Sequence, residues 1–528
     1  MTVKKINEVD KVKVYNANVE RNKEYNLRLE EYYIWYKGIS DLIVDFYLNR
    51  QAMVFPKTHE QFRNTRDYFW VATAKEKDFK KTHSGIPRRM VKLLSAVTGK
   101  PKIDVKRKDD KSKKIEVNRA AQDRLDNILK GCKFYRIIKN KQQPLTLVYG
   151  DGAFFSMINT DVSEYPFLEY YPATNVEFEY YNDMIVSITA KRYIIKDTLA
   201  YVLCEKRSTR KVDNKKIATI DYELYRLKSI DSDEVLNQVD LSKLEETKAL
   251  VPHQEFPSFN RVLATPIIYD LDDETGRGTS LFAGRLDLFD DLDQSLSQRS
   301  NSVRLSTPVE YMDQELVDYD ENGTPKKPKR YDRRFILTKG DKNAVGQINN
   351  KIETNQPQLN FSQYSDEALE TLMLILDGTI SPATMGIELA RKDNALAQRE
   401  KEKITMQTRD DIIEMQMEAI EDICNLLLQL DDYMKSEDKS IKITSDYMIS
   451  VNYPEYASPT FDAKLQTLVP AYTSGIISPE KVVNELWGDS LTEEEKQKEI
   501  KWLEENKQNN TQSIPGEDEI DPLSYEGE

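Results

Sequence analysis

The sequence predicts an α+β fold, with helical segments at both ends of the chain and antiparallel strands between them. Apolar residues recur at helical spacing in the first sixty residues, where Gly38 divides the pattern into two pieces. Residues 145–230 are instead rich in β-branched and aromatic side chains that partly alternate with polar ones, which favours strands. The strongest helical period lies beyond both regions, over roughly 394–432. Helices and strands are thus segregated along the chain, as in α+β proteins.

A further helix is expected over residues 85–100, where Gly99 supplies a stop. The charge run at 107–114 then indicates a solvated loop. The antiparallel β region is expected in the segments LTLVYGDGAFFSMIN, MIVSITAKRYIIK, LAYVLCEKR and ATIDYELYRLK. Gly150-Asp151-Gly152, inside the first segment, indicates a hairpin or bulge rather than a phosphate loop, because no helix signal follows it.

Two predicted helices flank a small insertion. The runs 281–305 and 362–376 each carry an apolar stripe, and Pro308 ends the first of them. Residues 306–361 between them combine short strand patterns with Pro and Gly turns. We therefore expect an antiparallel helix pair that carries a mixed module at its tip. Six Lys and Arg residues lie within 326–334 of this module, and a docking surface for an acidic partner or nucleic acid and a solvated loop explain them equally well.

The longest predicted helix covers 394–432. Its apolar stripe runs from Ile404 to Leu430 in steps of three or four residues, and Asp393 is placed to cap its start. At 1.5 Å per residue it would span about 58 Å, more than an ordinary globular helix. Its first third, ALAQREKEK, is almost wholly polar, so we expect that end to project while the other end packs.

The remainder of the chain is expected to close the fold. Residues 440–455 indicate a short strand segment that returns to the β region. SPEKVVNELWG and LTEEEKQKEIKWLEENK indicate two more helices, and an acidic tail that we expect to be disordered follows them.

Charge and cysteine content limit the classes of function. The formal net charge is −14, and the last forty residues hold 13 acidic against 4 basic residues. A net acidic chain is not built to grip nucleic acid by neutralising phosphates, although it could surround DNA without holding it. Cys132, Cys204 and Cys424 are far apart, which excludes a disulfide framework, disfavours a zinc site and suggests buried thiols in a reducing compartment. Because no signal segment and no uncharged apolar stretch of 18 residues is present, we expect a soluble cytoplasmic product.

Most catalytic signatures are missing from the sequence. It contains no GxxxxGK[ST] phosphate loop, no HExxH and no GxSxG. Its three histidines, His59, His83 and His253, are widely separated, which disfavours a histidine-based catalytic centre.

Two acidic segments invite a metal-binding interpretation. Asp290, Asp291 and Asp293 could ligate Mg²⁺ in a nuclease-like site, since hard cations take carboxylates, but a solvated helix face is the favoured interpretation. The segment DLDDETG at 270–276 lacks the closing Glu of a calcium loop and is interpreted as a turn. We therefore expect no metal and no cofactor.

Several segments resemble the portal proteins of tailed double-stranded DNA bacteriophages. WYKGISDLIVDFY (35–47) is similar to a helix near the portal N-terminus, and GIPRRMVKLLSAVTGKPKIDV (85–105) is similar to the helix before the first strands. LVYGDGAFFSMIN looks like the strand pair that follows. The most specific match is SPATMGIELARKDNALAQREKEKITMQTRD (381–410), which looks like the segment that runs through the portal tunnel loop into the long helix. The chain departs from the family at one place, because many portals have Ser-Gly-x-Ala where it reads Asp393-Asn394-Ala395. The resemblance as a whole covers about residues 30–480.

The resemblance implies a portal-type subunit with the parts that these proteins share. In chain order they would be an α/β wing (1–280), a stem helix (281–305), a small mixed α/β clip (306–361), the returning stem helix (362–378), a tunnel loop (379–394), a long wing or channel-side helix (395–432), a wing-closing segment (433–475) and a helical crown with an acidic disordered tail (476–528). Gly378 and Gly386 would be the hinges of the tunnel loop.

The resemblance also implies a function without chemistry of its own. The protein would not be an enzyme but a homo-oligomeric ring, usually of twelve subunits, at one capsid vertex of the virion, assembled in the host bacterial cytoplasm. Double-stranded DNA would pass through its channel without sequence specificity, packaged by a separate terminase and later ejected. Other expected partners are the major capsid and scaffold proteins and the head–tail connector or adaptor, with no membrane. Net acidity fits this, because phosphates slide past a like-charged wall.

Two groups of site residues follow from the resemblance. The DNA channel and tunnel loop would use Thr379, Ser381, Met385, Arg391, Lys392, Asn394 and Gln398. The clip would dock the terminase or the connector through Lys326, Lys327, Lys329 and Arg330. No catalytic or metal-binding residue is implied.

Two alternatives stay open at this point. One is a metal-dependent DNA-processing enzyme that uses Asp290, Asp291 and Asp293. The other is a non-viral coiled-coil scaffold built on 394–432. The scaffold is disfavoured because the stripe steps average about 3.7 residues rather than the 3.5 of a left-handed coiled coil, and because it leaves the inserted module unexplained.

Overall fold

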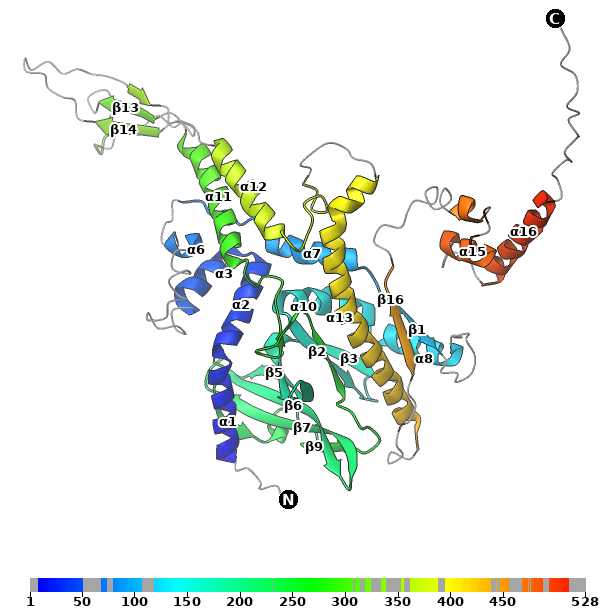
Figure 1. The fold of residues 1–528 in the computed structure, drawn as a ribbon. Coiled ribbons are helices and arrows are strands. Elements are labelled where there is room, and N and C mark those ends of the chain that lie inside the picture. Colours follow the sequence, from blue (N-terminus) through cyan, green and yellow to red (C-terminus); the bar gives the residue numbers. More distant parts are fainter. Residues whose placement is uncertain are drawn as a thin grey trace, which may run out of the picture. The chain divides into compact units, whose positions relative to one another are not determined.

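The computed structural model divides the 528-residue chain into two compact units, Met1–Pro454 and Glu455–Glu528, which are described separately below. It describes residues 8–50, 68–73, 79–106, 118–230, 232–306, 309–313, 319–323, 334–338, 353–355, 361–387, 395–437, 443, 447–454, 468–472, 474, 476–487 and 493–511. The chain is a mixed α+β protein, as predicted (Figure 1).

The N-terminal part of the first unit is helical, as its periodicity predicts. It contains α1 (Glu8–Arg21), α2 (Lys23–Lys37), α3 (Ser40–Asp45), a π-helical turn η1 (Phe46–Arg50), α6 (Phe69–Ala72) and α7 (Ile86–Thr98). Gly38 ends α2 in the left-handed region, with φ 65°, and its N–H donates to the carbonyl of Ile34 at 2.9 Å. Gly99 follows the last residue of α7, at φ 81°. Both predicted glycine stops are confirmed.

The next stretch, 118–149, is helical where a strand was predicted for its end. It holds α8 (Arg119–Gly131), α9 (Phe134–Ile137), a second π-helical turn η2 (Ile138–Gln142) and α10 (Gln143–Tyr149). Gly150 stops α10 at φ 95°, and β2 (Asp151–Met157) begins directly after it, so the hairpin or bulge interpretation was wrong. Leu147 and Val148 are both fully buried, and a short apolar run of this kind looks the same in a buried helix and a buried strand.

The antiparallel β region forms one large sheet. Its order is β4 (Val176–Tyr181), β5 (Met184–Lys196), β6 (Leu199–Val212), β7 (Lys215–Leu227) and β8 (Val235–Val239), and β9 (His253–Phe256) also pairs with β7. All these pairs are antiparallel, with Ala190 opposite Glu205 and Lys206 opposite Asp221. Positive-φ residues make the tight turns, such as Asp213-Asn214 between β6 and β7. The prediction of an antiparallel region is therefore confirmed.

Three smaller sheets complete this part of the first unit. The strands β10 (Ala264–Ile268), β2 and β3 (Phe167–Pro172) form one, and the short hairpin β11 (Leu271–Asp272) and β12 (Arg277–Gly278) forms another. In the third, β1 (Lys102–Lys106) pairs with β16 (Met448–Asn452), so Ile103 lies opposite Val451. The predicted strand within 440–455 is confirmed, but its partner is β1 rather than the central region. Short 3₁₀ turns lie at η3 (Ala173–Asn175) and η4 (Leu241–Lys243).

The helices α11 (Leu286–Leu305) and α12 (Phe361–Leu376) form an antiparallel pair (Figure 1). The Arg285 side chain, just before α11, donates to the carbonyl of Ile375 at the end of α12. At the other end, the Arg299 guanidinium lies over the Phe361 ring at 5.6 Å. Between the two helices the chain forms β13 (Val309–Asp313), β14 (Arg334–Thr338) and β15 (Glu353–Asn355), with β13 parallel to β14 and antiparallel to β15. The predicted helix pair with an inserted strand module is confirmed.

The longest helix, α13 (Ala395–Lys435), has 41 residues and joins two hydrophobic cores. Ile412 belongs to the core that α2, α7, α10, α11 and α12 share. Further along, Ile420 and Leu427 belong to the core formed with α8, β1, β2, β3 and β16. The burial of three successive residues, 426–428, means that protein surrounds this end on all sides. The predicted long helix with a packed C-terminal end is confirmed.

In the second unit, α15 (Pro479–Trp487) and α16 (Glu493–Thr511) lie where the sequence predicts helices. They pack through Val482, Val483 and Ile500. The Tyr472 hydroxyl donates to the carbonyl of Leu503 at 3.0 Å. Among all the described helices of both units, none is long and apolar enough to cross a membrane.

Candidate functional site

The chain that leaves α12 forms a compact series of turns over residues 377–387. The N–H of Ile380 donates to the carbonyl of Leu376, and the N–H groups of Met385 and Ile387 both donate to the carbonyl of Pro382, at 2.9 to 3.0 Å. Gly378 and Gly386 take the left-handed conformation, at φ 69° and 76°. Small residues allow the backbone to fold this tightly. Residues 377–387 are therefore a structured segment, and we call it the base.

Hydroxyl groups fasten this base to α13. The N–H of Ser381 donates to the Thr405 hydroxyl at 2.8 Å, and the Thr384 hydroxyl lies 3.0 Å from the same oxygen. One turn further along α13, the Thr408 hydroxyl donates to the carbonyl of Thr379 at 2.7 Å. Thr405 and Thr408 are both buried, so these bonds satisfy backbone groups that no water reaches. We call the residues Thr379, Ser381, Thr384, Thr405 and Thr408 the hydroxyl clamp.

Apolar contacts hold the same segment from its other side. Ile380 and Met385 are buried in the core that contains Leu376 and Ile412. Burying side chains of this size contributes on the order of 1.5–3 kcal/mol each. Hydrophobic packing and the hydroxyl clamp together fix the position of residues 379–387 against α13.

Arg285 links the base of this segment to the helix pair. Its Nε donates to the carbonyl of Ile375 and its Nη2 to the carbonyl of Asp377, at 3.2 and 3.3 Å. These carbonyls belong to the end of α12, where a cation is favoured by the helix dipole. Burial lowers the pKa of Arg285, so the charge is held in partly dry surroundings.

The structure describes only some of the predicted site residues. Thr379, Ser381 and Met385 are buried within this chain and contact α13 or the core instead of presenting their side chains to solvent. Arg391, Lys392 and Asn394 lie outside the described residues; Gln398 is in α13, and its side chain lies outside them. The clip residues Lys326, Lys327, Lys329 and Arg330 also lie outside them. Their role in a channel or a docking surface stays a prediction.

The acidic group on α11 has a structural role that the sequence interpretation missed. Asp290 is 2% exposed and accepts hydrogen bonds from the N–H groups of Phe69 and Trp70, at 2.6 and 3.3 Å. Asp293 is fully buried and accepts from the Trp70 indole and the N–H of Ser84, at 3.0 and 2.7 Å. The solvated-face interpretation is therefore wrong for these two residues; only Asp291 is exposed.

These carboxylates attach Phe69, Trp70 and Ser84 to α11. His83 completes the attachment, with its Nδ1 2.6 Å from Asp293 Oδ2. Burial raises the pKa of Asp290 to about 7, although the two backbone N–H groups act in the opposite direction. Both carboxylates are occupied by hydrogen-bond donors of this chain, which leaves them poorly placed to hold Mg²⁺.

The second acidic segment, 270–276, forms the turn between β11 and β12. The Asp272 side chain accepts hydrogen bonds from the N–H of Glu274 and from the Thr275 hydroxyl, at 3.2 and 2.7 Å. The N–H of Gly276 closes the turn onto the carbonyl of Asp272 at 2.8 Å. The turn interpretation is confirmed. In the described ranges, no three His, Cys, Asp or Glu side chains are grouped as a metal site would require.

Sequence reasoning missed the residues that hold the base of the loop. Thr408 is one position of the predicted stripe from Ile404 to Leu430, and Thr405 was not singled out. The available signal was the hydroxyl residue itself, since a polar group on an apolar stripe must find a partner when it is buried. The partner could not be known without the packing of residues 379–384 on α13.

Comparison with known proteins assigns no family to this arrangement. No protein-family model matches the chain, and no curated protein matches it. What the chain does has therefore to be inferred from its own residues and contacts.

Proposed function

We propose that the chain is a portal-type subunit, which assembles into a ring with a central channel for double-stranded DNA. In this proposal α11 and α12 are the stem, and the β13–β15 module is the clip. The first unit supplies the wing, with α13 as the channel-side helix, and α15 and α16 belong to the crown. Ring closure around one axis is the usual outcome of head-to-tail contacts between identical chains.

One observation carries the proposal. The helix pair α11/α12, with a small strand module inserted at its tip, leads directly into a clamped segment of small residues and then into a helix of 41 residues. The same segment, 381–410, is the one whose sequence most resembles a portal tunnel loop and long helix. Order of elements and sequence resemblance point to the same part of the chain.

The coiled-coil alternative has less support. Ile420, Leu426, Leu427 and Leu428 of α13 are fully buried by their own chain, and a seam between separate chains would need apolar residues left open to a partner. The C-terminal end of the helix has no such seam among the residues described.

The enzyme alternative also has less support. Two of its three proposed metal ligands, Asp290 and Asp293, are buried and accept hydrogen bonds from residues 69, 70 and 84.

In this proposal the chain itself performs no reaction. A separate motor would drive the DNA through the channel. That motor, and later a connector, would bind the clip. The virion would be its final location.

Negative-stain imaging of the purified full-length chain tests the proposal. We expect rings with an axial hole wide enough for duplex DNA. Images of rods or of compact particles without a hole would contradict it. A parallel assay for Mg²⁺-dependent DNA cleavage addresses the enzyme alternative: cleavage that Asp291→Asn abolishes would favour the enzyme over the channel.

A further inference from the structure

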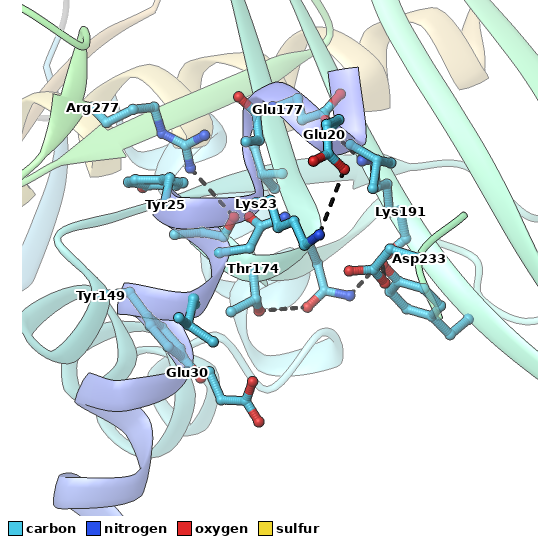
Figure 2. Close-up of a pocket in the computed structure, with 18 of the residues that line it drawn as sticks. Glu20, Lys23, Tyr25, Glu30, Tyr149, Thr174, Glu177, Lys191, Asp233 and Arg277 are labelled. Atoms are coloured by element: carbon cyan, nitrogen blue, oxygen red, sulfur yellow. Dashed lines mark hydrogen bonds and ion pairs between the residues drawn. The ribbon is translucent and has the colours of Figure 1, made fainter. Parts of the chain in front are cut away.

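The first unit contains a cavity of about 650 Å³ lined by Tyr25, Tyr149 and Tyr193 (Figure 2). Its basic side chains already pair with carboxylates of the same chain, as Arg277–Asp151, Lys191–Glu177 and Lys23–Glu20. A charged ligand would have to compete with these pairs. The charges of this cavity therefore satisfy one another, and it serves here as a contrast.

A second cavity of the first unit has unpaired charges. It has a volume of about 870 Å³ and lies between α7 and the helical stretch α9–η2–α10. On α7 the lining residues recur at the spacing of one helix face: Arg88, Val91, Lys92, Ser95 and Ala96. Tyr135, the π-helical turn η2 and the start of α10 form the opposite wall. The volume is that of a small-molecule site, typically about 300–1,000 Å³, and single π-helical turns are frequent at functional sites.

Positive charge dominates this second cavity. Its basic residues are Arg88 and Lys92 of α7, Lys100 just beyond α7, and Lys139 of η2. Among the described residues that line it, none is Asp or Glu, although acidic residues outnumber basic ones by 90 to 76 in the whole chain. No described carboxylate pairs with any of the four, and the Lys100 ammonium instead lies over the Tyr135 ring at 3.9 Å. A concave site with one sign of charge concentrates ions of the other sign.

Two buried polar atoms in the wall also lack partners. Gln143 is 2% exposed, and its Nε2 has no hydrogen-bond acceptor among the described residues. The Ser95 hydroxyl, on the α7 side, is buried and unpaired as well. Buried polar groups are nearly always hydrogen-bonded, because an unmade bond leaves the cost of desolvation uncompensated. A ligand with hydrogen-bonding edges would supply the missing partners.

The rest of the wall is apolar or aromatic. Its members include Tyr36, Val91, Ile138 and Pro144. Four cations are more than a single carboxylate needs, so they favour a group with several negative charges, such as a phosphate chain. An apolar wall that also presents an unpaired amide and hydroxyl favours a flat ring with polar edges. A nucleoside polyphosphate combines these two properties in one small molecule.

We propose that this cavity binds a nucleoside polyphosphate. Its phosphates lie among the side chains of Arg88, Lys92 and Lys139, and its base lies against the apolar wall, where it pairs with Gln143 and Ser95. The proposal concerns binding alone and includes no hydrolysis. Every lining residue belongs to the first unit, so the site needs neither the ring nor the channel proposed above.

Calorimetric titration of the full-length chain tests this site, with each of the four ribonucleoside triphosphates in turn, in EDTA and at about 150 mM NaCl. We expect saturable binding of one nucleotide per chain for at least one base. Inorganic tripolyphosphate should bind at least about tenfold more weakly, because it has the charge but no base to fill the wall. Equal affinity for tripolyphosphate, or no saturable binding of any nucleotide, would overturn the proposal. Tighter binding of a short single-stranded oligonucleotide would also overturn it, in favour of a nucleic-acid site.

Variants of one lysine from each wall locate the binding. Lys92→Gln and Lys139→Gln should each weaken it roughly three- to tenfold, because each removes one charge near the phosphates. Lys196→Gln and Lys216→Gln are the matched controls, since they remove the same charge from exposed positions outside the cavity, and they should change affinity less than about twofold. An equal loss in the controls would contradict the proposal, because it would reflect diffuse attraction to the whole surface.

Gln143→Met separates binding from stability. Methionine keeps the length of the side chain but removes the unpaired amide, so the ligand-free variant should unfold at a denaturant midpoint no lower than that of the wild type. Its affinity for the nucleotide should fall about fivefold or more. Wild-type affinity in this variant would overturn the placement of the base. If the variant folds poorly, the comparison of Lys92→Gln with Lys196→Gln decides the proposal, because both positions are exposed.

Discussion

The backbone N–H of Ser381 donates a hydrogen bond to the side-chain hydroxyl of Thr405 at 2.8 Å, and both residues are buried. This bond joins the turns after α12 to a helix residue that lies 24 positions further along the chain. Together with the Thr408 contact to Thr379, it holds the first residues of the proposed tunnel loop (379–394) against α13. A hinge at Gly378, one of the two that the resemblance implies, is therefore not expected, because hydrogen bonds hold the backbone that follows it.

Thr405→Val should loosen this base. The substitution keeps the shape of the side chain but leaves the buried N–H of Ser381 without its acceptor, at a cost of about 1–3 kcal/mol. Thr405→Ser retains the hydroxyl and should stay closer to the wild type. Urea unfolding reports the stability, and hydrogen exchange at the Ser381 amide reports the local effect. Protection of that amide in Thr405→Val equal to the wild type would contradict the clamp; Thr160→Val, at an exposed turn, is the control.

Asp290 should make stability depend on pH. Burial raises its pKa to about 7 from the ordinary 3.8, so the folded state favours the protonated form. That contribution is fully present below about pH 4 and is lost as the pH rises through about 7. Asp290→Asn cannot ionise and should therefore gain stability relative to the wild type between about pH 5 and pH 8.

Denaturant midpoints of both proteins at about pH 5 and pH 8 measure this difference. Asp287→Asn, which removes a carboxylate from an exposed position on the same helix, is the control. A difference between Asp290→Asn and the wild type that stays constant across this range would show that Asp290 does not titrate within it.

Gly150→Ala should be strongly destabilising. A Cβ at this position would lie 2.1 Å from the carbonyl oxygen of Gly278, and the backbone has φ 95°. Neither backbone can move without disturbing the start of β2 or the β11–β12 hairpin, so we expect a loss of about 4 kcal/mol or more. Soluble yield and the denaturant midpoint measure it.

Gly284→Ala is the matched control for this clash. Gly284 also has positive φ, at 71°, but a methyl group at its Cα would meet no other atom within 4 Å. It should lose only about 1 kcal/mol, from backbone strain alone. Similar losses in the two variants would mean that the close approach of Gly150 and Gly278 contributes nothing.

Arg409→Lys should weaken the attachment of α13 to α7. The Arg409 Nε donates to the carbonyl of Val97 at 3.0 Å, and another guanidinium nitrogen donates to the carbonyl of Pro454. A lysine cannot span both carbonyls in this way, and we expect a loss of about 1–3 kcal/mol in denaturant unfolding. The exposed Arg210→Lys should change stability by less than about 0.5 kcal/mol. A loss at Arg409 no larger than at Arg210 would show that one hydrogen bond suffices.

Long periodic segments were the most predictable part of the fold. The predicted 362–376 and 394–432 became α12 (Phe361–Leu376) and α13 (Ala395–Lys435), because an apolar stripe over many turns specifies a helix with little help from the rest of the chain. Glycine stops were also reliable, since Gly38 and Gly99 take backbone conformations that other residues disfavour.

Short apolar runs were less predictable. Residues 143–149 form a helix although their β-branched and aromatic content favours a strand, because burial on every side removes the difference in periodicity. The structural role of Asp290 and Asp293 could not be predicted from the sequence either. Their partners at Phe69, Trp70 and Ser84 are more than 200 residues away, and no local pattern contains them.

The candidate site was also only partly predictable from the sequence. The resemblance of 381–410 identified the segment between helix pair and long helix, but the hydroxyl clamp within it depends on tertiary contacts. The cavity lined by Tyr25, Tyr149 and Tyr193 gave no signal in the sequence, because its wall combines residues from α2, α10, β5 and the loop before β8. Such sites become visible only when the packing of separate elements is known.

The mass of the purified full-length chain in solution tests the central claim most directly. Twelve copies of the 61.4-kDa chain would weigh about 740 kDa, and light scattering distinguishes this clearly from smaller assemblies. We predict a closed oligomer near that mass whose size does not grow further with concentration. A chain that stays a monomer, dimer or trimer at every concentration would contradict the proposed ring.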